Sequence, residues 1–172
     1  MFRKSVLAAA LVSLLISSFP SVSSAATLPD CSISGTASAD RINGTPGNDV
    51  ICSGAGNDIV NGLGGNDIIY GGSGNDLILG GTGKDEIYGE AGNDNISGGD
   101  GADSLTGGAG NDVLSGGAGN DTIVGGSEND NISGGDDTDL LVFTTLAAMA
   151  GNGTVSGGAG TDAMRFTGDI GA

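Results

Sequence analysis

Gly71-Gly72-Ser73-Gly74-Asn75-Asp76-Leu77-Ile78-Leu79 combines a glycine-rich segment, an aspartate and three aliphatic residues. Glycine disfavours a helix and readily adopts the positive φ of a tight turn. The three aliphatic residues that follow Asp76 suit a strand, in which the middle side chain points to one face and its two neighbours to the other. The stretch therefore predicts a glycine-rich turn over residues 71–76, followed by a very short β-strand over residues 77–79.

This nine-residue pattern recurs along most of the chain. An aspartate stands at every ninth position from Asp40 to Asp139, and an aliphatic residue follows each aspartate by two positions. Such strict regularity indicates a repeat architecture. The aliphatic residues are Ile42, Ile51, Val60, Ile69, Ile78, Ile87, Ile96, Leu105, Leu114, Ile123, Ile132 and Leu141.

A nine-residue unit with one strand makes half a coil. Two units, or about 18 residues, complete one turn of a parallel β-solenoid, and successive coils pair about 4.8 Å apart. We therefore expect an all-β fold of about six coils over residues 35–142, with the aliphatic residues forming two facing rows inside.

The repeat loses its phase after Asp139. The motif resumes at Gly157-Gly158-Ala159-Gly160-Thr161-Asp162, 23 residues after its last regular copy. Residues 143–172 are therefore predicted to contain an irregular, looped-out insertion and a degenerate last coil that caps the solenoid. Open solenoid ends need such covers because unpaired strand edges promote aggregation.

Stacked coils place the aspartates in two columns of like charge. Neighbours about 5 Å apart repel by about 0.8 kcal/mol in water and about 3 kcal/mol at an effective dielectric constant of 20. Cations are therefore expected between the coils. One column contains Asp40, Asp58, Asp76, Asp94, Asp112 and Asp130, and the other contains Asp49, Asp67, Asp85, Asp103, Asp121 and Asp139.

The available ligands select the cation. Carboxylates and the carbonyl groups of glycine turns offer only oxygen, which favours a hard ion. Calcium accepts six to eight oxygen ligands in loose geometry, whereas magnesium requires a small octahedron and retains its waters. The sequence therefore predicts several bound Ca²⁺ ions.

Composition and charge exclude several other functions. The chain has 172 residues, 36 of them glycine, with 21 acidic residues, five basic residues and no histidine. A nucleic-acid partner is not expected because its binding requires a cationic surface. Imidazole acid–base catalysis and histidine-containing metal sites are excluded. We expect that the protein is not an enzyme.

The N-terminus has the pattern of a secretory signal peptide. A basic start with Arg3 and Lys4 precedes a mostly apolar run over residues 6–16 and small residues up to Ala26. The apolar run is too short for a membrane span, which needs about 20 residues. We expect residues 1–26 to be removed, residues 27–34 to form an N-terminal cap segment, and the protein to be secreted.

Two cysteines remain beyond this segment. Secretion would place Cys31 and Cys52 in a compartment where disulfides persist, and they can form one intramolecular bond. The alternative is a pair of free thiols.

The nonapeptides resemble the calcium-binding repeat of the repeats-in-toxin (RTX) family. The resemblance covers residues 35–142 and implies a right-handed parallel β-roll, with calcium held between adjacent coils by aspartate carboxylates and turn carbonyls. Pairs such as Asp58 and Asp76 would then share an ion, giving at most about ten ions from five gaps in each column. Turn carbonyls that the resemblance assigns to these sites include those of Gly54, Gly56, Gly71, Gly72, Gly74, Gly80, Gly81, Gly83, Gly107, Gly108, Gly110, Gly116, Gly117 and Gly119.

Some repeats depart from the family pattern. The unit that ends at Asp40 has lost two glycines, Glu128 replaces a turn glycine, and Asp136 and Asp137 crowd Asp139. We expect the middle units, which contain Asp58 to Asp121, to bind calcium best.

The sequence favours a secreted, calcium-binding structural module of a surface or matrix, with an unidentified cell-surface or polysaccharide partner. One alternative is a calcium-dependent adhesion or ice-binding solenoid, although only Thr82 occupies the third motif position where a threonine ladder would lie. A polysaccharide-cleaving β-helix enzyme is a third alternative, but no single aspartate is singled out. Tyr70 and Tyr88 are expected side by side on one outer face, and Ile59, Leu77 and Leu79 on the other.

Overall fold

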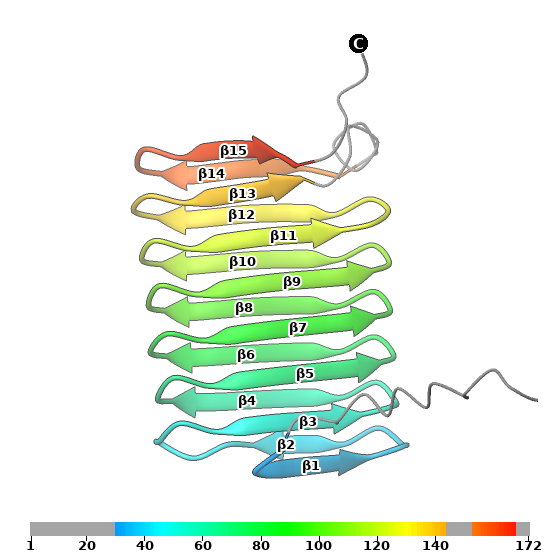
Figure 1. The fold of residues 1–172 in the computed structure, drawn as a ribbon. Coiled ribbons are helices and arrows are strands. Elements are labelled where there is room, and N and C mark those ends of the chain that lie inside the picture. The colour runs from blue at the N-terminus through cyan, green and yellow to red at the C-terminus, as the bar shows by residue number, and fades with distance from the viewer. Residues whose placement is uncertain (1–29, 144–152, 168–172) are drawn as a thin grey trace, which may run out of the picture.

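The computed structural model describes residues 30–143 and 153–167. In this part of the chain every regular element is a β-strand, and the strands stack one above another along a single axis (Figure 1). In chain order the strands are β1 (Ile33–Thr36), β2 (Arg41–Asn43), β3 (Val50–Gly54), β4 (Ile59–Gly64), β5 (Ile68–Ser73), β6 (Leu77–Thr82), β7 (Glu86–Ala91), β8 (Asn95–Asp100), β9 (Ser104–Ala109), β10 (Val113–Ala118), β11 (Thr122–Gly126), β12 (Asn131–Asp136), β13 (Leu140–Phe143), β14 (Val155–Ala159) and β15 (Ala163–Phe166).

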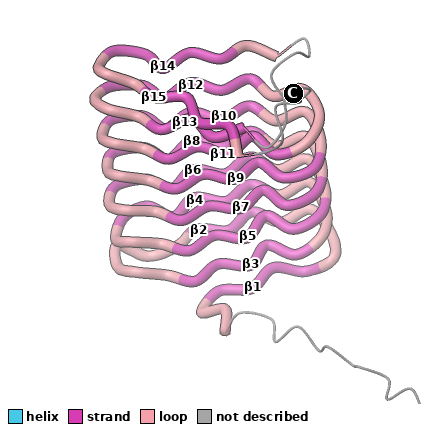
Figure 2. The backbone as a smooth tube through the Cα atoms, turned by 45° about the horizontal axis from the view of Figure 1, so that its top comes forward, coloured by secondary structure: helices cyan, strands magenta, loops and turns pink. Residues whose placement is uncertain are grey.

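The strands form two parallel sheets, one on each side of a flattened coil (Figure 2). The odd-numbered strands make an eight-stranded sheet and the even-numbered strands make a seven-stranded sheet. Residues 18 apart lie opposite each other, as with Ile78 and Ile96 in β6 and β8. The predicted all-β solenoid with an 18-residue coil is confirmed.

The core consists of one inward aliphatic side chain from each repeat. All twelve predicted aliphatics are buried, with exposed fractions from 0% for Ile51 to 8% for Ile42. Parallel stacking places each of them against the equivalent residue of the next coil, so the two rows form one continuous core.

The strands are longer than the sequence predicts. From β4 to β12 each is five or six residues long and continues through the first motif glycines, as β6 does through Gly80 and Gly81. Gly81 pairs with Leu63 and Gly99 despite its positive φ of 116°. The glycines thus take part in the sheets, and the turns are correspondingly shorter than the predicted six residues.

The final coil stacks on the solenoid with an offset of 23 residues. Leu141 in β13 lies opposite Met164 in β15, and Ile132 in β12 lies opposite Val155 in β14. The rings of Phe143 and Phe166 stack with centroids 5.7 Å apart. The expected insertion lies largely in residues 144–152, outside the described residues.

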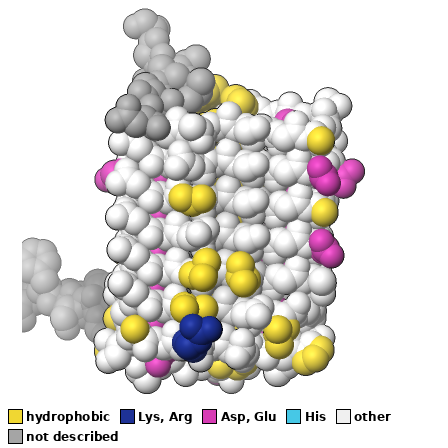
Figure 3. Space-filling model, turned by 180° about the vertical axis from the view of Figure 1, so that it is seen from behind, with side chains coloured by type: hydrophobic (Ala, Val, Ile, Leu, Met, Phe, Trp, Pro, Cys, Tyr) yellow, Lys and Arg dark blue, Asp and Glu magenta, His cyan; other side chains and the backbone are white. Residues whose placement is uncertain are grey.

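The two outer faces carry different side chains. The rings of Tyr70 and Tyr88 stack on the odd-strand sheet, with centroids 5.2 Å apart. On the even-strand sheet Ile59 pairs with Leu77, and Leu79 lies on the same outer face. Figure 3 shows this second face, where hydrophobic side chains gather near a basic one. Both predicted neighbour sets are confirmed.

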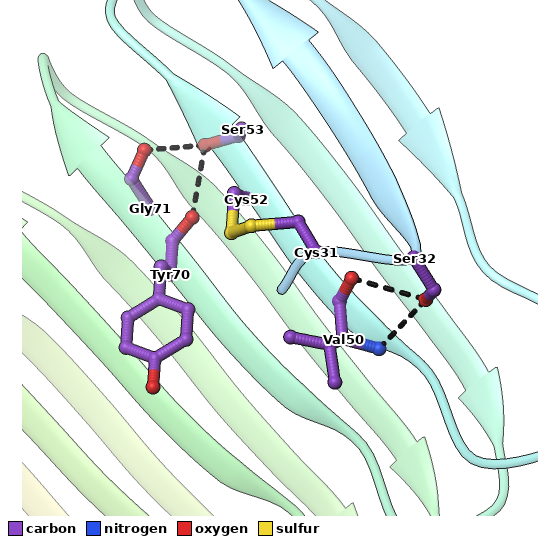
Figure 4. The surroundings of a disulfide bond; sticks show 7 residues. All are labelled: Cys31, Ser32, Val50, Cys52, Ser53, Tyr70 and Gly71. Carbon is purple, nitrogen blue, oxygen red and sulfur yellow. Dashed lines mark hydrogen bonds between the residues drawn. A yellow bond between two sulfur atoms is a disulfide. The ribbon is translucent and has the colours of Figure 1, made fainter. Parts of the chain in front are cut away.

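A disulfide closes the first coil. Cys31, just before β1, is bonded to Cys52 in β3, with Cα atoms 5.9 Å apart (Figure 4). The predicted signal peptide and residues 27–29 of the predicted N-terminal cap segment lie outside the described residues. No helix in the described ranges is long and apolar enough to span a membrane.

Candidate metal centre

The repeat aspartates line the two narrow edges of the solenoid. Each lies in the turn between two strands, as Asp85 does between β6 and β7, and its side chain points inward. Eleven of the twelve are buried, with exposed fractions of at most 7%, and Asp40 in the first coil is half-buried. The fold thus encloses a row of carboxyl groups along each edge.

From Asp58 onward, one oxygen of each repeat carboxyl group is held by the neighbouring coil. The backbone N–H of Asp67 donates to Asp85 Oδ1 at 2.9 Å, and the N–H of Asp85 donates to Asp103 Oδ1 at 2.8 Å. The same bond joins successive aspartates throughout both columns. This ladder fixes the direction of the repeat carboxyl groups from Asp58 to Asp139 from the backbone.

The second oxygen is left without a partner in most repeats. Leaving a buried carboxylate oxygen unpaired is costly, and an unsatisfied buried group in a regular fold calls for a ligand such as an ion. The unpartnered atoms are the Oδ2 atoms of Asp58, Asp67, Asp76, Asp85, Asp94, Asp103, Asp112, Asp121 and Asp139.

The first glycine of the motif provides the space beside this oxygen. A Cβ atom on Gly80 would lie 2.5 Å from Asp85 Oδ2 and 2.5 Å from the carbonyl oxygen of Gly98. Two oxygens from adjacent coils thus converge on a point that only a glycine leaves open. We call this space the oxygen gap. It recurs, with an unpartnered Oδ2 and a carbonyl oxygen of the next coil, at Gly62, Gly71, Gly80, Gly89, Gly98, Gly107, Gly116 and Gly134.

Burial makes these carboxyl groups hard to ionise. Desolvation is the largest cause, and charge repulsion within the column adds to it, raising the pKa of Asp76, Asp112 and Asp121 to about 6. The bond from the neighbouring N–H opposes this rise. The pKa is also raised for Asp67, Asp85, Asp94, Asp103 and Asp130, and desolvation again dominates.

Most of the other predicted turn carbonyls belong to the second and third glycines of the Gly-Gly-x-Gly-x-Asp motif, at motif positions two and four. Gly81 and Gly83 have φ values of 116° and 125°, and a Cβ on either would collide with a carbonyl group of the preceding coil. The glycines of this kind are Gly54, Gly56, Gly72, Gly74, Gly81, Gly83, Gly108, Gly110, Gly117 and Gly119. Of the predicted set, Gly71, Gly80, Gly107 and Gly116 hold the first motif position, and the carbonyl groups of the last three point into oxygen gaps.

A second ladder of hydrogen bonds, not predicted from the sequence, joins the outer sides of the turns through asparagine side chains. Asn48 Oδ1 accepts the backbone N–H of Asn66 at 2.8 Å, and Asn66 Oδ1 accepts that of Lys84 at 2.9 Å. The asparagine that precedes most of the aspartates is its signal in the sequence. Asn57, Asn75, Asn93 and Asn111 make the equivalent bonds along the other edge.

Asp162 extends one column beyond the predicted set. Its Oδ1 accepts the backbone N–H of Asp139 at 3.2 Å, as in the regular coils. The carbonyl oxygen of Gly157 approaches Gly134 beside Asp139 Oδ2. The degenerate last repeat therefore completes one further oxygen gap, and its Gly-Gly-x-Gly-x-Asp sequence was the signal for it.

The carboxyl groups do not gather into larger clusters. Within residues 30–143 and 153–167, no group of three or more His, Cys, Asp or Glu side chains is placed to hold a metal ion. An ion in an oxygen gap would therefore be held by the carboxylates of adjacent coils together with backbone carbonyl groups. Such an all-oxygen set suits calcium.

The chain belongs to the RTX family of calcium-binding repeats. The pattern of the RTX calcium-binding nonapeptide repeat (4 copies) matches residues 32–60, 53–87, 70–105, 79–114, 106–141 and 144–169. No curated protein matches the chain. The repeat defines a β-roll module that binds calcium, consistent with the stacked coils and the oxygen gaps.

Proposed function

We propose that this protein is a secreted structural module whose β-roll is held together by Ca²⁺ ions in the oxygen gaps. The observation that carries the proposal is the set of nine buried carboxylate oxygens without a partner, aligned along both edges. When bound, calcium supplies positive charge that compensates these carboxylates. The Asp Oδ2 atoms and the carbonyl groups of the first motif glycines are the proposed ligands.

Export would couple calcium binding to location. Extracellular modules commonly bind calcium with dissociation constants of about 10⁻⁴–10⁻³ M, which favours binding outside a cell. The disulfide between Cys31 and Cys52 supports an oxidising compartment. The basic, apolar and small-residue pattern of residues 1–26 supports secretion.

The observations favour a structural role over ice binding or catalysis. Thr82 lies between Gly64 and Asp100 in the neighbouring coils, so no threonine ladder forms at this position. The aspartates repeat the same geometry in coil after coil, which suits a repeated ligand and not a unique catalytic residue. A partner at a cell surface or in a polysaccharide matrix is part of this proposal.

Isothermal titration of the metal-free protein tests calcium binding. We expect several calcium ions to bind with dissociation constants of about 10⁻⁴–10⁻³ M. Magnesium should bind far more weakly because its small octahedral shell does not suit a set of backbone carbonyl groups. Absence of calcium binding, or equal binding of magnesium, would contradict the proposal.

A further inference from the structure

The first coil satisfies its own carboxylates with threonine residues. Asp40 Oδ2 accepts the backbone N–H of Thr36 at 2.6 Å and its hydroxyl group at 2.8 Å. Asp49 Oδ2 accepts the same two donors from Thr45, at 2.6 Å and 2.9 Å. These oxygens are the equivalents of those without partners in later coils, so in the first two turns they have hydrogen-bond partners without a cation.

The third turn is closed by a serine. Ser53 occupies the first motif position, where the other repeats have glycine, and its side chain is fully buried. Its hydroxyl group donates to the carbonyl oxygens of Gly71 and Tyr70 (Figure 4). The serine side chain therefore takes up the space beside the Gly71 carbonyl oxygen, the counterpart of the Gly98 carbonyl oxygen in the gap at Gly80.

The backbone changes at the same point in the chain. Among the described residues, the positive φ values characteristic of the later turns begin at Gly54. The two earlier turns have Thr36 and Thr45 in place of the second motif glycine, and neither threonine has a positive φ. A Cβ atom on Gly47 would meet only Thr45 Oγ1, at 3.8 Å, whereas one on Gly65, its equivalent in the next coil, would collide with backbone atoms. The first coil is thus built with ordinary turns.

The disulfide adds a covalent closure to this coil. Cys31 and Cys52 are 21 residues apart, and closing a loop of this length stabilises the fold by restricting the unfolded chain. The hydroxyl group of Ser32 also donates to the carbonyl oxygen of Val50 at 3.1 Å and accepts the N–H of Val50 at 2.9 Å (Figure 4). Covalent and hydroxyl-based contacts therefore hold β1 on β3 without a metal.

We propose that the first coil is a calcium-free end cap, and that the ladder of ions begins at the gap between Asp67 and Asp85. This inference rests on the proposed calcium binding and deepens it. Of the nine unpartnered Oδ2 atoms, that of Asp58 belongs to the turn in which Ser53 stands at the first motif position, and the other eight belong to turns with an open gap. The gaps lie at Asp67, Asp76, Asp85, Asp94, Asp103, Asp112, Asp121 and Asp139, the last of these facing Asp162.

A matched pair of aspartate variants tests the cap. Asp49→Asn and Asp85→Asn remove the same charge from the same column, and bound calcium is counted by equilibrium dialysis of the full chain. We expect eight ions in the unaltered protein and in Asp49→Asn. Asp85→Asn should lose one or two ions because Asp85 borders two open gaps. A loss of ions in Asp49→Asn equal to that in Asp85→Asn would overturn the inference.

A gain-of-site variant provides the second test. Ser53→Gly opens the third gap and should raise the calcium count by one, while Thr106→Val, which removes a hydroxyl group from the outer face of β9, should leave it unchanged. An unchanged count in Ser53→Gly, or nine or more ions in the unaltered protein, would overturn the cap. Absence of calcium binding in every protein would instead contradict the proposed function itself.

Discussion

Replacing Gly80 by alanine is expected to eliminate the calcium site between Asp85 and Asp103 and to destabilise the solenoid. The new methyl group would lie 2.5 Å from Asp85 Oδ2 and from the carbonyl oxygen of Gly98. Overpacking of this kind costs about 1–3 kcal/mol. The φ of Gly80 lies outside the positive range, so the variant tests the loss of space beside Asp85 Oδ2 and not backbone strain. The calcium count should fall by one, with a lower thermal midpoint at saturating calcium.

Gly47→Ala is the matched control. The added methyl group meets only Thr45 Oγ1 at 3.8 Å, an ordinary contact, and Gly47 lies in the predicted calcium-free coil. Neither the calcium count nor the thermal midpoint should change appreciably. Equal behaviour of the two alanine variants would show that the oxygen gaps do not hold the ions.

Acidification of the metal-free protein is expected to increase its β-sheet content. Burial raises the pKa of Asp76, Asp112 and Asp121 from 3.8 to about 6, so the folded state retains protons that the unfolded state has lost. Their contribution to folding stability is fully present below the unfolded pKa and is lost as the pH rises through about 6. Far-ultraviolet circular dichroism in metal-free buffer should therefore show more sheet at about pH 5 than at about pH 7.5.

Saturating calcium should reverse the sign of this dependence. Bound calcium favours the ionised carboxylates, so protons compete with it and acidification should release the ion. The two titrations, with and without calcium, should therefore move in opposite directions between about pH 7.5 and about pH 5. A metal-free protein whose sheet content falls on acidification would contradict the account of the buried carboxyl groups.

The repeat allowed most of the architecture to be predicted. A period of nine residues with one aliphatic side chain per unit determines the coil length and the inward rows, as Ile69, Ile78 and Ile87 illustrate. Periodicity also predicts neighbours: Tyr70 and Tyr88 are 18 residues apart, one coil length, and their rings stack. Strand length was harder to predict, because glycine propensity favours turns whereas Gly80 lies inside β6 and Gly81 pairs with both adjacent coils.

The roles of individual residues depend on contacts that periodicity does not encode. All twelve aspartates share one spacing, yet Asp49 is satisfied by Thr45 whereas Asp85 Oδ2 has no partner. The single change of glycine to serine at position 53 is small in the sequence but fills a gap in the packed edge. Such differences arise from which donor reaches which oxygen, and this is visible only in three dimensions.

Calcium is expected to hold the coils of the solenoid together. The most direct test is far-ultraviolet circular dichroism of the purified protein during titration from chelator to about 10 mM calcium, above the usual affinity range of extracellular modules, with magnesium as the control. We predict a cooperative change from coil to sheet with calcium alone. Full β-structure in chelator would contradict the account and indicate a solenoid that is stable without metal.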